Sequence, residues 1–467
     1  MKSNTCSVMS MVVVGVVVCT VAQGAEISLN ASDGSGATSF NTGLHWDGAE
    51  APSPGNTYVT GAFLIRTPTT GGSLTFAGDS LRVDTGGGHF VTKSAATFTF
   101  NTGGLILNGG TVSGASQTSS TLAGLVEVRA NSVMQATGGS TEILNVESVI
   151  SGSGNLRIAG VLNAAGTVVF KSANTHTGET IVDPYGNLRL ANQNALQYST
   201  LTMSGNASSS LKFDNSVAAN AFTIGGLAAT NSGTGYNIDL RNNAGTPAAV
   251  ALTVGGNNSN TTYAAVLSGG GSLIKVGTGT LTLAGTNTYT GATTVSNGTL
   301  AITGVLSNSP VTVVAGASLS GTGLVVNVVT NSGHITPGVG SGIAGIGTLV
   351  ASNVTWNGES AAGSSWIWDA DPNSAAVDRL FINGNFSKGT GSAFSFDFRG
   401  GALQKGTTYT LVEWTGTSGF AVGDFSASNV ILPGTLGSRA NFLIESGVTN
   451  RLKMQVVSPT GTLLSVW

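Results

Sequence analysis

The chain has 467 residues, of which 18 are Lys or Arg and 21 are Asp or Glu, so its formal net charge at pH 7 is −3. This charge balance lacks the positive surface that proteins use to bind nucleic acid or anionic membranes, and it excludes both classes of partner. Charged residues make up only 8% of the chain and 69 residues are glycine, yet 40% are apolar, so the chain can bury a core.

The N-terminus has the layout of a secretory signal peptide. Met1 and Lys2 precede an apolar run over residues 8–22, and the small residues Gly24 and Ala25 follow this run. This run is shorter than the roughly 20 apolar residues that span a bilayer, so we expect export with cleavage after Gly24 rather than a membrane anchor. Both cysteines fall within the signal, so the mature chain would contain no disulfide.

Short apolar alternations, most of them followed by Gly or Asn, recur along the mature chain. Strands of this length ended by such corners are typical of stacked turns in a solenoid, whereas a β-sandwich favours longer strands and hairpin dipeptides. We therefore expect an all-β parallel solenoid, with Leu281, Leu283, Val295 and Leu300 facing inward. The alternations are Leu74–Phe76, Leu81–Val83, Leu105–Leu107, Leu156–Ile158, Leu188–Leu190, Leu252–Val254, Leu281–Leu283 and Leu300–Ile302.

Two segments look like copies of one unit, which is stronger evidence for a solenoid than composition. The better copy covers residues 271–300, and a weaker one covers residues 154–190. Three positions align at a constant offset between the copies. They are Asn287, Tyr289 and Gly291 in the first, and Asn174, His176 and Gly178 in the second.

The better copy, which reads GTGTLTLAGTNTYTGATTVSNGTL, resembles the autotransporter-associated β-strand repeat, also called the passenger-associated transport repeat. The segments at 334–338, 347–349, 378–384 and 406–412 also look like this group. The resemblance implies a right-handed parallel β-helix on a secreted passenger that meets the outer-membrane secretion machinery. It brings no catalytic residues.

The C-terminal region raises two questions, namely whether it inserts into a membrane and what its tryptophans do. The 130 residues after Pro337 are too few for a translocator of 8 to 12 strands at roughly 10 residues each with turns, so we expect no integral membrane domain. Tryptophans gather here, either as core or as faces on which sugars could stack. They are Trp356, Trp366, Trp368, Trp414 and Trp467.

Two acidic motifs resemble known sites. Asp84-Thr85-Gly86 matches the triplet of aspartic proteases, but those enzymes need two such carboxylates and only one triplet occurs. The segment Asp369–Asn373, with Asp371 between, begins like a calcium loop. Its sixth and twelfth positions are Ser and Leu instead of the required Gly and Glu. We interpret both motifs, and Asp378 nearby, as turn or strand-edge carboxylates.

Other motifs carry little chemistry. Residues 340–345 fit a dinucleotide-binding pattern but follow no clear strand and open no helix. His45, His89, His176 and His334 lie far apart in sequence and form no zinc motif. Lys275 is the single charged residue between 269 and 336, so no group of charges typical of a polysaccharide lyase is visible there. We predict no catalytic residue, cofactor or metal.

We divide the chain into a signal at 1–24, a β-rich segment at 25–150, a repeat-bearing solenoid at 151–336 and a C-terminal β-domain at 337–467. The leading hypothesis is an exported structural passenger, secreted or displayed at the cell surface, that resembles an adhesin and presents loops on a rigid solenoid. Extracellular polysaccharides or cell-surface components would be its partners. A carbohydrate-active β-helix enzyme similar to polysaccharide lyases and a non-catalytic glycan-binding module remain the alternatives.

Overall fold

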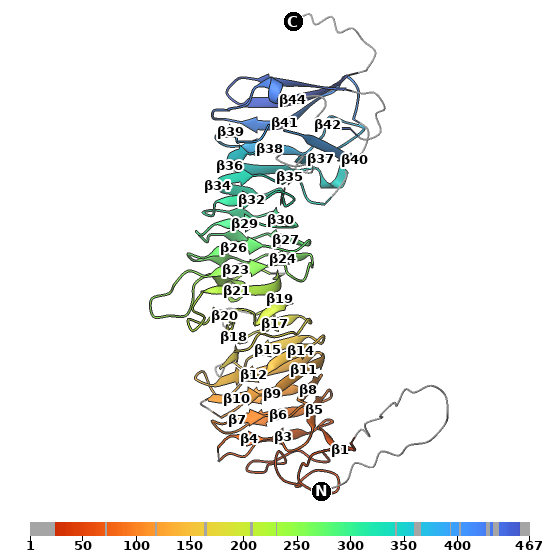
Figure 1. The fold of residues 1–467 in the computed structure, drawn as a ribbon, viewed down its shortest axis with the longest axis vertical. Coiled ribbons are helices and arrows are strands. Elements are labelled where there is room, and N and C mark those ends of the chain that lie inside the picture. Colours follow the sequence, from red (N-terminus) through yellow and green to blue (C-terminus); the bar gives the residue numbers. More distant parts are fainter. Residues whose placement is uncertain are drawn as a thin grey trace, which may run out of the picture.

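The computed structural model describes residues 24–457 except 71, 117–118, 163–165, 206–208, 230, 341–342, 359–365, 393, 401–402, 426–429 and 433–438. All of the predicted signal except Gly24 lies outside these residues. The strands stack along one long axis, with β1 near one end of the rod and β44 near the other (Figure 1). The only helices in the described part are three short 3-10 turns, none of which could cross a membrane: η1 (Thr234–Tyr236), η2 (Ile343–Gly345) and η3 (Val422–Asp424).

One ladder of parallel strands, the long sheet, extends through the described part of the rod. Sixteen strands follow one another in it, and the ladder continues without a break past residues 150 and 336, where the sequence placed domain boundaries. The division of the chain into these segments stays a prediction. In order of pairing they are β3 (Leu64–Arg66), β6 (His89–Thr92), β9 (Thr111–Gly114), β12 (Ser132–Ala136), β15 (Leu156–Ala159), β17 (Thr180–Val182), β19 (Leu196–Met203), β21 (Ala221–Ala228), β23 (Ala251–Val254), β26 (Ser272–Lys275), β29 (Thr293–Val295), β32 (Val311–Val313), β34 (Leu324–Asn331), β36 (Thr348–Trp356), β38 (Arg379–Ile382) and β41 (Thr408–Trp414).

Two further parallel sheets complete the wall of the N-terminal half. The first contains β1 (Glu26–Ser28), β2 (Thr57–Val59), β5 (Ser80–Asp84), β8 (Leu105–Asn108), β11 (Leu125–Ala130) and β14 (Val149–Gly152). The second contains β4 (Leu74–Thr75), β7 (Thr97–Thr99), β10 (Ser119–Ala123), β13 (Ile143–Val146), β16 (Thr167–Phe170), β18 (Asn187–Leu190) and β20 (Ser210–Phe213).

Towards the C-terminus other strands take over. The middle sheet contains β24 (Thr261–Tyr263), β27 (Thr280–Leu283), β30 (Thr299–Ile302), β33 (Ser318–Gly321) and β35 (His334–Pro337), and the C-terminal sheet contains β37 (Trp366–Ala370), β40 (Phe396–Gly400) and β42 (Val430–Ile431). The short strands are β22 (Ile238–Asp239), β25 (Leu267–Ser268), β28 (Thr286–Asn287), β31 (Val305–Leu306) and β39 (Phe386–Lys388).

The turns of the coil repeat in register. Thr280 pairs with Thr299 and Thr299 pairs with Ser318, so the chain advances by 19 residues per turn here. Every pairing in the middle sheet is parallel and joins one turn to the next, which excludes the antiparallel hairpins of a β-sandwich. The predicted parallel solenoid is therefore confirmed.

The strands form because apolar and polar residues alternate with the two-residue period of a pleated strand. Leu281, Leu283, Val295 and Leu300 are all at most 1% exposed, as predicted, whereas Thr282 on the same strand faces outward and is half-buried. Stacking identical alternations from turn to turn produces one continuous apolar core along the axis of the rod.

The ends of the coil differ from its middle. At the C-terminal end β44 (Asn450–Val457) pairs antiparallel with β41, and β43 (Arg439–Glu445) pairs antiparallel with β44. Because β44 runs against the direction of the ladder, it occupies the edge of β41 on which the next parallel strand would otherwise pair. At the N-terminal end, the segment of residues 30–50 lies beside β1 and β3, with Trp46 buried against Tyr58 at a ring-centroid distance of 4.9 Å.

The C-terminal tryptophans are core residues. Trp356, Trp366, Trp368 and Trp414 are at most 2% exposed, and the rings of Trp356 and Trp366 stack at 3.8 Å. Their faces are therefore closed to a sugar ring, which corrects the idea that this cluster could be a stacking platform. Trp467 lies outside the described residues.

Candidate functional site

The asparagine of each repeat copy binds backbone atoms inside the coil. Asn287 is fully buried; its Oδ1 accepts a hydrogen bond of 3.0 Å from the N–H of Leu267, and its Nδ2 donates one of 3.0 Å to the carbonyl of Gly285. Asn174 accepts the equivalent bond of 2.9 Å from the N–H of Ile150. The Oδ1 atom therefore replaces a backbone partner at a corner in both copies, whereas the Nδ2 group of Asn174 donates to a different carbonyl, that of Ala195, at 2.9 Å.

The glycine of each copy is required by the close approach of successive turns. A Cβ on Gly291 would lie 2.3 Å from the carbonyl oxygen of Gly271 in the preceding turn. A Cβ on Gly178 would lie 2.0 Å from the carbonyl oxygen of Gly154. Real Cβ atoms do not approach backbone oxygens so closely, so a larger residue would push the two turns apart.

Hydroxyl groups continue the docking in the better copy. The Tyr289 hydroxyl lies 2.5 Å from Thr293 Oγ1, which lies 2.7 Å from Ser309 Oγ, and Ser309 donates to the carbonyl of Gly291 at 2.7 Å. Burial raises the pKa of Tyr289 to about 12, so the phenol stays neutral. This series of hydrogen bonds therefore ends on a backbone carbonyl inside the core.

The weaker copy repeats this chain with one substitution. Thr180 and Ser199 lie 2.8 Å apart and Ser199 donates to the carbonyl of Gly178, as Thr293 and Ser309 do in the better copy. His176 takes the place of the tyrosine and contacts the carbonyl of Gly154 through Nε2 at 2.6 Å, while burial lowers its pKa. The aligned residues therefore hold turns together and leave no polar atom for a ligand.

Lys275 is the charged residue that the sequence could not explain. Its Nζ donates to three carbonyl oxygens, at 2.7 Å to Val276, 2.9 Å to Gly277 and 3.2 Å to Asn297. These acceptors match the three donors of an ammonium group. Burial lowers the pKa of Lys275 to about 8. The side chain ties one corner to the next turn and serves the fold.

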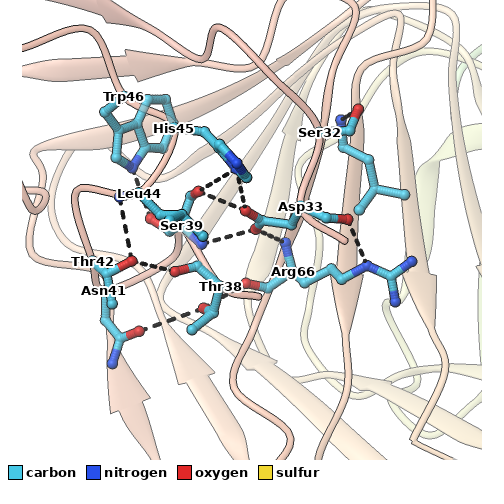
Figure 2. Close-up of polar contacts among 11 residues, drawn as sticks. Ser32, Asp33, Thr38, Ser39, Asn41, Thr42, Leu44, His45, Trp46 and Arg66 are labelled. Carbon is cyan, nitrogen blue, oxygen red and sulfur yellow. Dashed lines mark hydrogen bonds and ion pairs between the residues drawn. The ribbon is translucent and has the colours of Figure 1, made fainter. Parts of the chain in front are cut away.

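A serine, a histidine and an aspartate meet at the N-terminal end of the coil, as Figure 2 shows. Asp33 accepts hydrogen bonds from Ser39 Oγ at 2.6 Å and from the N–H groups of Ser39 and Arg66, both at 2.8 Å. His45 Nδ1 lies 3.0 Å from Asp33 and 3.5 Å from Ser39 Oγ. Trp46 donates to the carbonyl of Ser39 at 2.7 Å.

These are the residue types of a nucleophilic triad, but their arrangement differs from one. In a triad the imidazole uses one nitrogen for the carboxylate and the other for the serine. Here the same His45 nitrogen faces both groups, and the Ser39 hydroxyl donates directly to Asp33. Ser39 is also fully buried. The cluster holds the segment of residues 30–50 in place over the first turn. The spacing of residues 33, 39 and 45 in the sequence gave no signal for it.

Among the acidic residues singled out from the sequence, Asp369 and Asp378 lie side by side, whereas Asp371 is bonded within its own turn. Asp371 is half-buried and accepts bonds from the Asn373 N–H at 2.9 Å and the Ser374 hydroxyl at 2.7 Å, as in an ordinary Asp turn. Asp378 is buried and accepts bonds of 2.8 Å from the N–H groups of Gly347 and Asp369. Burial raises the pKa of Asp378 to about 7. Within residues 24–457 as described, no three His, Cys, Asp or Glu side chains gather where they could hold a metal.

The remaining sequence candidates lie on separate turns. Asp84 ends β5 and pairs with Arg82 at 2.7 Å, while Asn108 of the next turn donates to it at 2.9 Å. His89 on β6 lies 2.6 Å from the Ser113 hydroxyl, and burial lowers its pKa. Neither is brought near the cluster around Asp378.

A hollow of about 340 Å³ lies over the middle sheet and ends at the C-terminal sheet. Asp369, which is 3% exposed, lines it, and its Oδ1 has no hydrogen-bond partner in the described part of the chain. Arg399 lines it too and holds Asp397 through Nε and Nη2 at 3.1 Å. The other lining residues are Thr280, Thr282, Thr299, Ala301, Ser318, Ser320, Thr336, Gly338, Val339, Gly340 and Ile367.

None of the sequence patterns described above indicated this hollow. A signal was nevertheless present, because hydroxyl residues recur at 280, 299 and 318 with the 19-residue period of the coil. Period and alternation together place them on one outer face, side by side.

Comparison with known proteins identifies the repeat. The passenger-associated-transport-repeat family matches residues 165–183 and 273–302, which overlap the two copies described above. The chain is also 29% identical over 194 residues to the adhesin BmaC autotransporter of Brucella suis biovar 1 (strain 1330). That alignment covers 41% of this chain and 5% of the relative, so the chain spans only a small part of that protein's length.

Proposed function

Because this chain is a protein with passenger-associated transport repeats, we propose that it is an exported structural passenger that acts at the cell surface or in the medium as an adhesin does. The observation that carries the proposal is the shared geometry of the two copies, in which Asn287 and Asn174 make equivalent buried bonds to the preceding turn. The adhesin BmaC autotransporter as a relative supports the same class of function.

The architecture suits display. A coil held by turn-to-turn contacts is stiff along its axis, and its outer face is covered by half-exposed Thr and Ser side chains that leave the core undisturbed when they change. Loops and outward rows can therefore carry recognition while the inside keeps the fold. The signal at residues 1–24, with cleavage after Gly24, would deliver the chain to the export machinery.

Catalysis is not part of the proposal. The Ser39, His45 and Asp33 side chains are bonded to one another in an arrangement unsuited to attack, and Asp371 is satisfied within its own turn. A lyase of acidic polysaccharides needs convergent carboxylates and cations, which the described charges do not supply. The chain would bind partners without transforming them.

The direct test is to express the full chain in a Gram-negative bacterium and to fractionate the cells into cytoplasm, periplasm, outer membrane and medium. We expect the protein outside the cytoplasm, with Ala25 as the first residue of the mature form. A matched chain that lacks residues 1–24 should remain in the cytoplasm. Retention of the full chain in the cytoplasm would reject the proposal.

Two assays of the purified mature protein test the rest. Cells that display the protein should bind immobilised polysaccharide or host-cell surfaces more than cells without it. Incubation with pectin, alginate and unfolded protein, with and without calcium, should yield no products. Turnover that is lost in Asp84→Asn or Asp371→Asn would show an enzyme instead.

A further inference from the structure

We propose that the hollow over the middle sheet binds a neutral saccharide chain, an inference that rests on the proposed function and names the chemistry of its partner. The hollow joins two parts of the coil, since β27, β30, β33 and β35 form its floor and β37 and β40 form its C-terminal end. None of its lining residues takes part in the docking of the repeat copies described above.

The floor presents two rows of hydroxyl groups. Thr280, Thr299 and Ser318 are register partners in successive strands and form the first row. In the second row, Thr282 is followed by Ala301, Ser320 and Thr336. Neighbouring rungs are about 4.8 Å apart, so both rows offer groups that donate and accept hydrogen bonds at regular intervals along the axis.

A polyol matches this pattern. Each saccharide unit offers several hydroxyl groups that both donate and accept, and successive units repeat along the chain as the rungs do. The outward Thr and Ser side chains are half-buried, so part of their hydration is already lost before a ligand arrives. Hydrogen bonds from the ligand would replace that water.

The C-terminal end of the hollow contains the strongest single indication of a ligand. Asp369 is 3% exposed and its Oδ1 accepts no hydrogen bond from any described residue, although a buried carboxylate oxygen should be satisfied. A sugar hydroxyl would supply the missing donor when the Asp369 side chain turns towards the hollow, since Oδ1 is closed to solvent in the unbound chain. Arg399 is the register partner of Asp369 on β40 and lines the same hollow.

Charge selects a neutral ligand. Among the described residues, Asp369 and Arg399 are the charged ones that line the hollow. Arg399 is paired with Asp397, which reduces its attraction for an acidic sugar, and the carboxylate of Asp369 repels such a sugar. A metal ion is not favoured, because the described part of the chain contains no cluster of three acidic or imidazole side chains.

A peptide fits less well. Peptides that add to a sheet need a free strand edge for their backbone. Here β27, β30 and β33 each pair on both sides within the middle sheet. No aromatic residue is among the described residues that line the hollow, so we expect binding that depends on hydrogen bonds and on the number of units in contact.

The test measures binding of neutral hexasaccharides of glucose, mannose, galactose and N-acetylglucosamine to the mature protein by titration calorimetry and ligand-detected NMR. Hexagalacturonate is the acidic comparison. At least one neutral hexasaccharide should bind, more tightly than hexagalacturonate and than its own disaccharide. No binding by any neutral hexasaccharide, or preference for hexagalacturonate, would overturn the proposal.

Variants locate the site. Asp369→Asn should raise Kd tenfold or more, because a charged acceptor becomes a neutral amide and the hydrogen bond loses its charge assistance. Thr299→Val should raise Kd severalfold with the side-chain shape kept. Thr294→Val is the matched control, since Thr294 is half-buried on β29 of the same turn but faces another side. Equal affinity of wild type and Thr299→Val, with melting temperatures unchanged, would remove the hollow from consideration even if the sugar binds elsewhere.

The two proposals fail separately. If the protein reaches the cell surface and binds none of the neutral hexasaccharides, the passenger function stands and the saccharide site is wrong. If the purified protein binds a hexasaccharide through Asp369 but is retained in the cytoplasm, the site stands and the passenger function is wrong.

Discussion

The repeat-bearing turns and the C-terminal turns solve the same packing problem with different residues. In residues 273–302 the interior consists mainly of Leu, Val and Ile together with Tyr289, and each buried polar side chain has a hydrogen-bond partner. Around Trp356, Trp366 and Trp368 the interior is aromatic, and four of the buried polar atoms have no partner within the described chain: Nε1 of these three tryptophans and Oδ1 of Asp369.

The difference indicates where stability and recognition reside. A turn whose polar groups all have partners gains most stability when it is repeated along the coil, because each added copy brings its own partners. A region with unmet hydrogen-bonding capacity is less stable by itself and more open to a ligand. The following experiments should either sharpen or break this contrast.

The largest effect should come from a charge in the core of the repeat. Leu283→Asp would bury an unpaired carboxylate between two turns and lower the free energy of unfolding by about 4 kcal/mol or more. Thr294→Asp, on the outer face of the same repeat, is the control and should change it by less than about 1 kcal/mol. Denaturant unfolding followed by circular dichroism measures both. Similar losses would mean that the alternation does not decide stability.

A smaller loss should follow removal of the repeat asparagine. Asn287→Ala leaves the buried N–H of Leu267 without its acceptor, so we expect a loss of about 2 kcal/mol. Asn174→Ala should cost a similar amount, because Asn174 serves Ile150 in the same way. Exposed Asn308, which bonds to the carbonyl of Thr288, is the control and its change to Ala should be nearly neutral. Unequal losses for the first two would break the equivalence of the copies.

The smallest effect, counted per pH unit, is the change in stability caused by the buried carboxyl group of Asp378. Burial raises the pKa of Asp378 from 3.8 to about 7, so the folded protein holds a proton that the unfolded chain releases near pH 4. This stabilisation is complete below about pH 4 and is lost as the pH rises through about 7.

The measurement is the difference in unfolding free energy between wild type and Asp378→Asn at several pH values. Relative to the variant, wild type should lose at most about 1.4 kcal/mol for each pH unit between pH 4 and pH 7. A difference that does not depend on pH would show that Asp378 titrates at its ordinary pKa.

The sequence predicted the inside of the coil far better than its ends. The two-residue alternation at Leu281 and Leu283 was sufficient, because in a solenoid each strand repeats the environment of the last. The alignment of Asn287 with Asn174 was visible for the same reason. The repeat therefore carries its structure in local sequence.

The C-terminal end escaped prediction because its contacts join distant segments. Asp369 lines the same hollow as Thr280, which is 89 residues earlier in the chain, and no local pattern connects them. Nor could composition decide whether the tryptophans face the core or solvent; both fit an enriched cluster. Ser39, His45 and Asp33 show the converse, since their proximity becomes informative only when the shared imidazole nitrogen is seen.

The sixteen-strand ladder also acts as a ruler. With rungs about 4.8 Å apart, it sets a length of about 70 Å between β3 and β41. The parallel ladder ends at β41, where the antiparallel pairing with β44 begins. Inserting or deleting one turn near the N-terminus would move the hydroxyl-lined hollow by a single rung relative to that end, with its floor unchanged. Reach and recognition could then evolve independently, the first by the number of turns and the second by outward side chains.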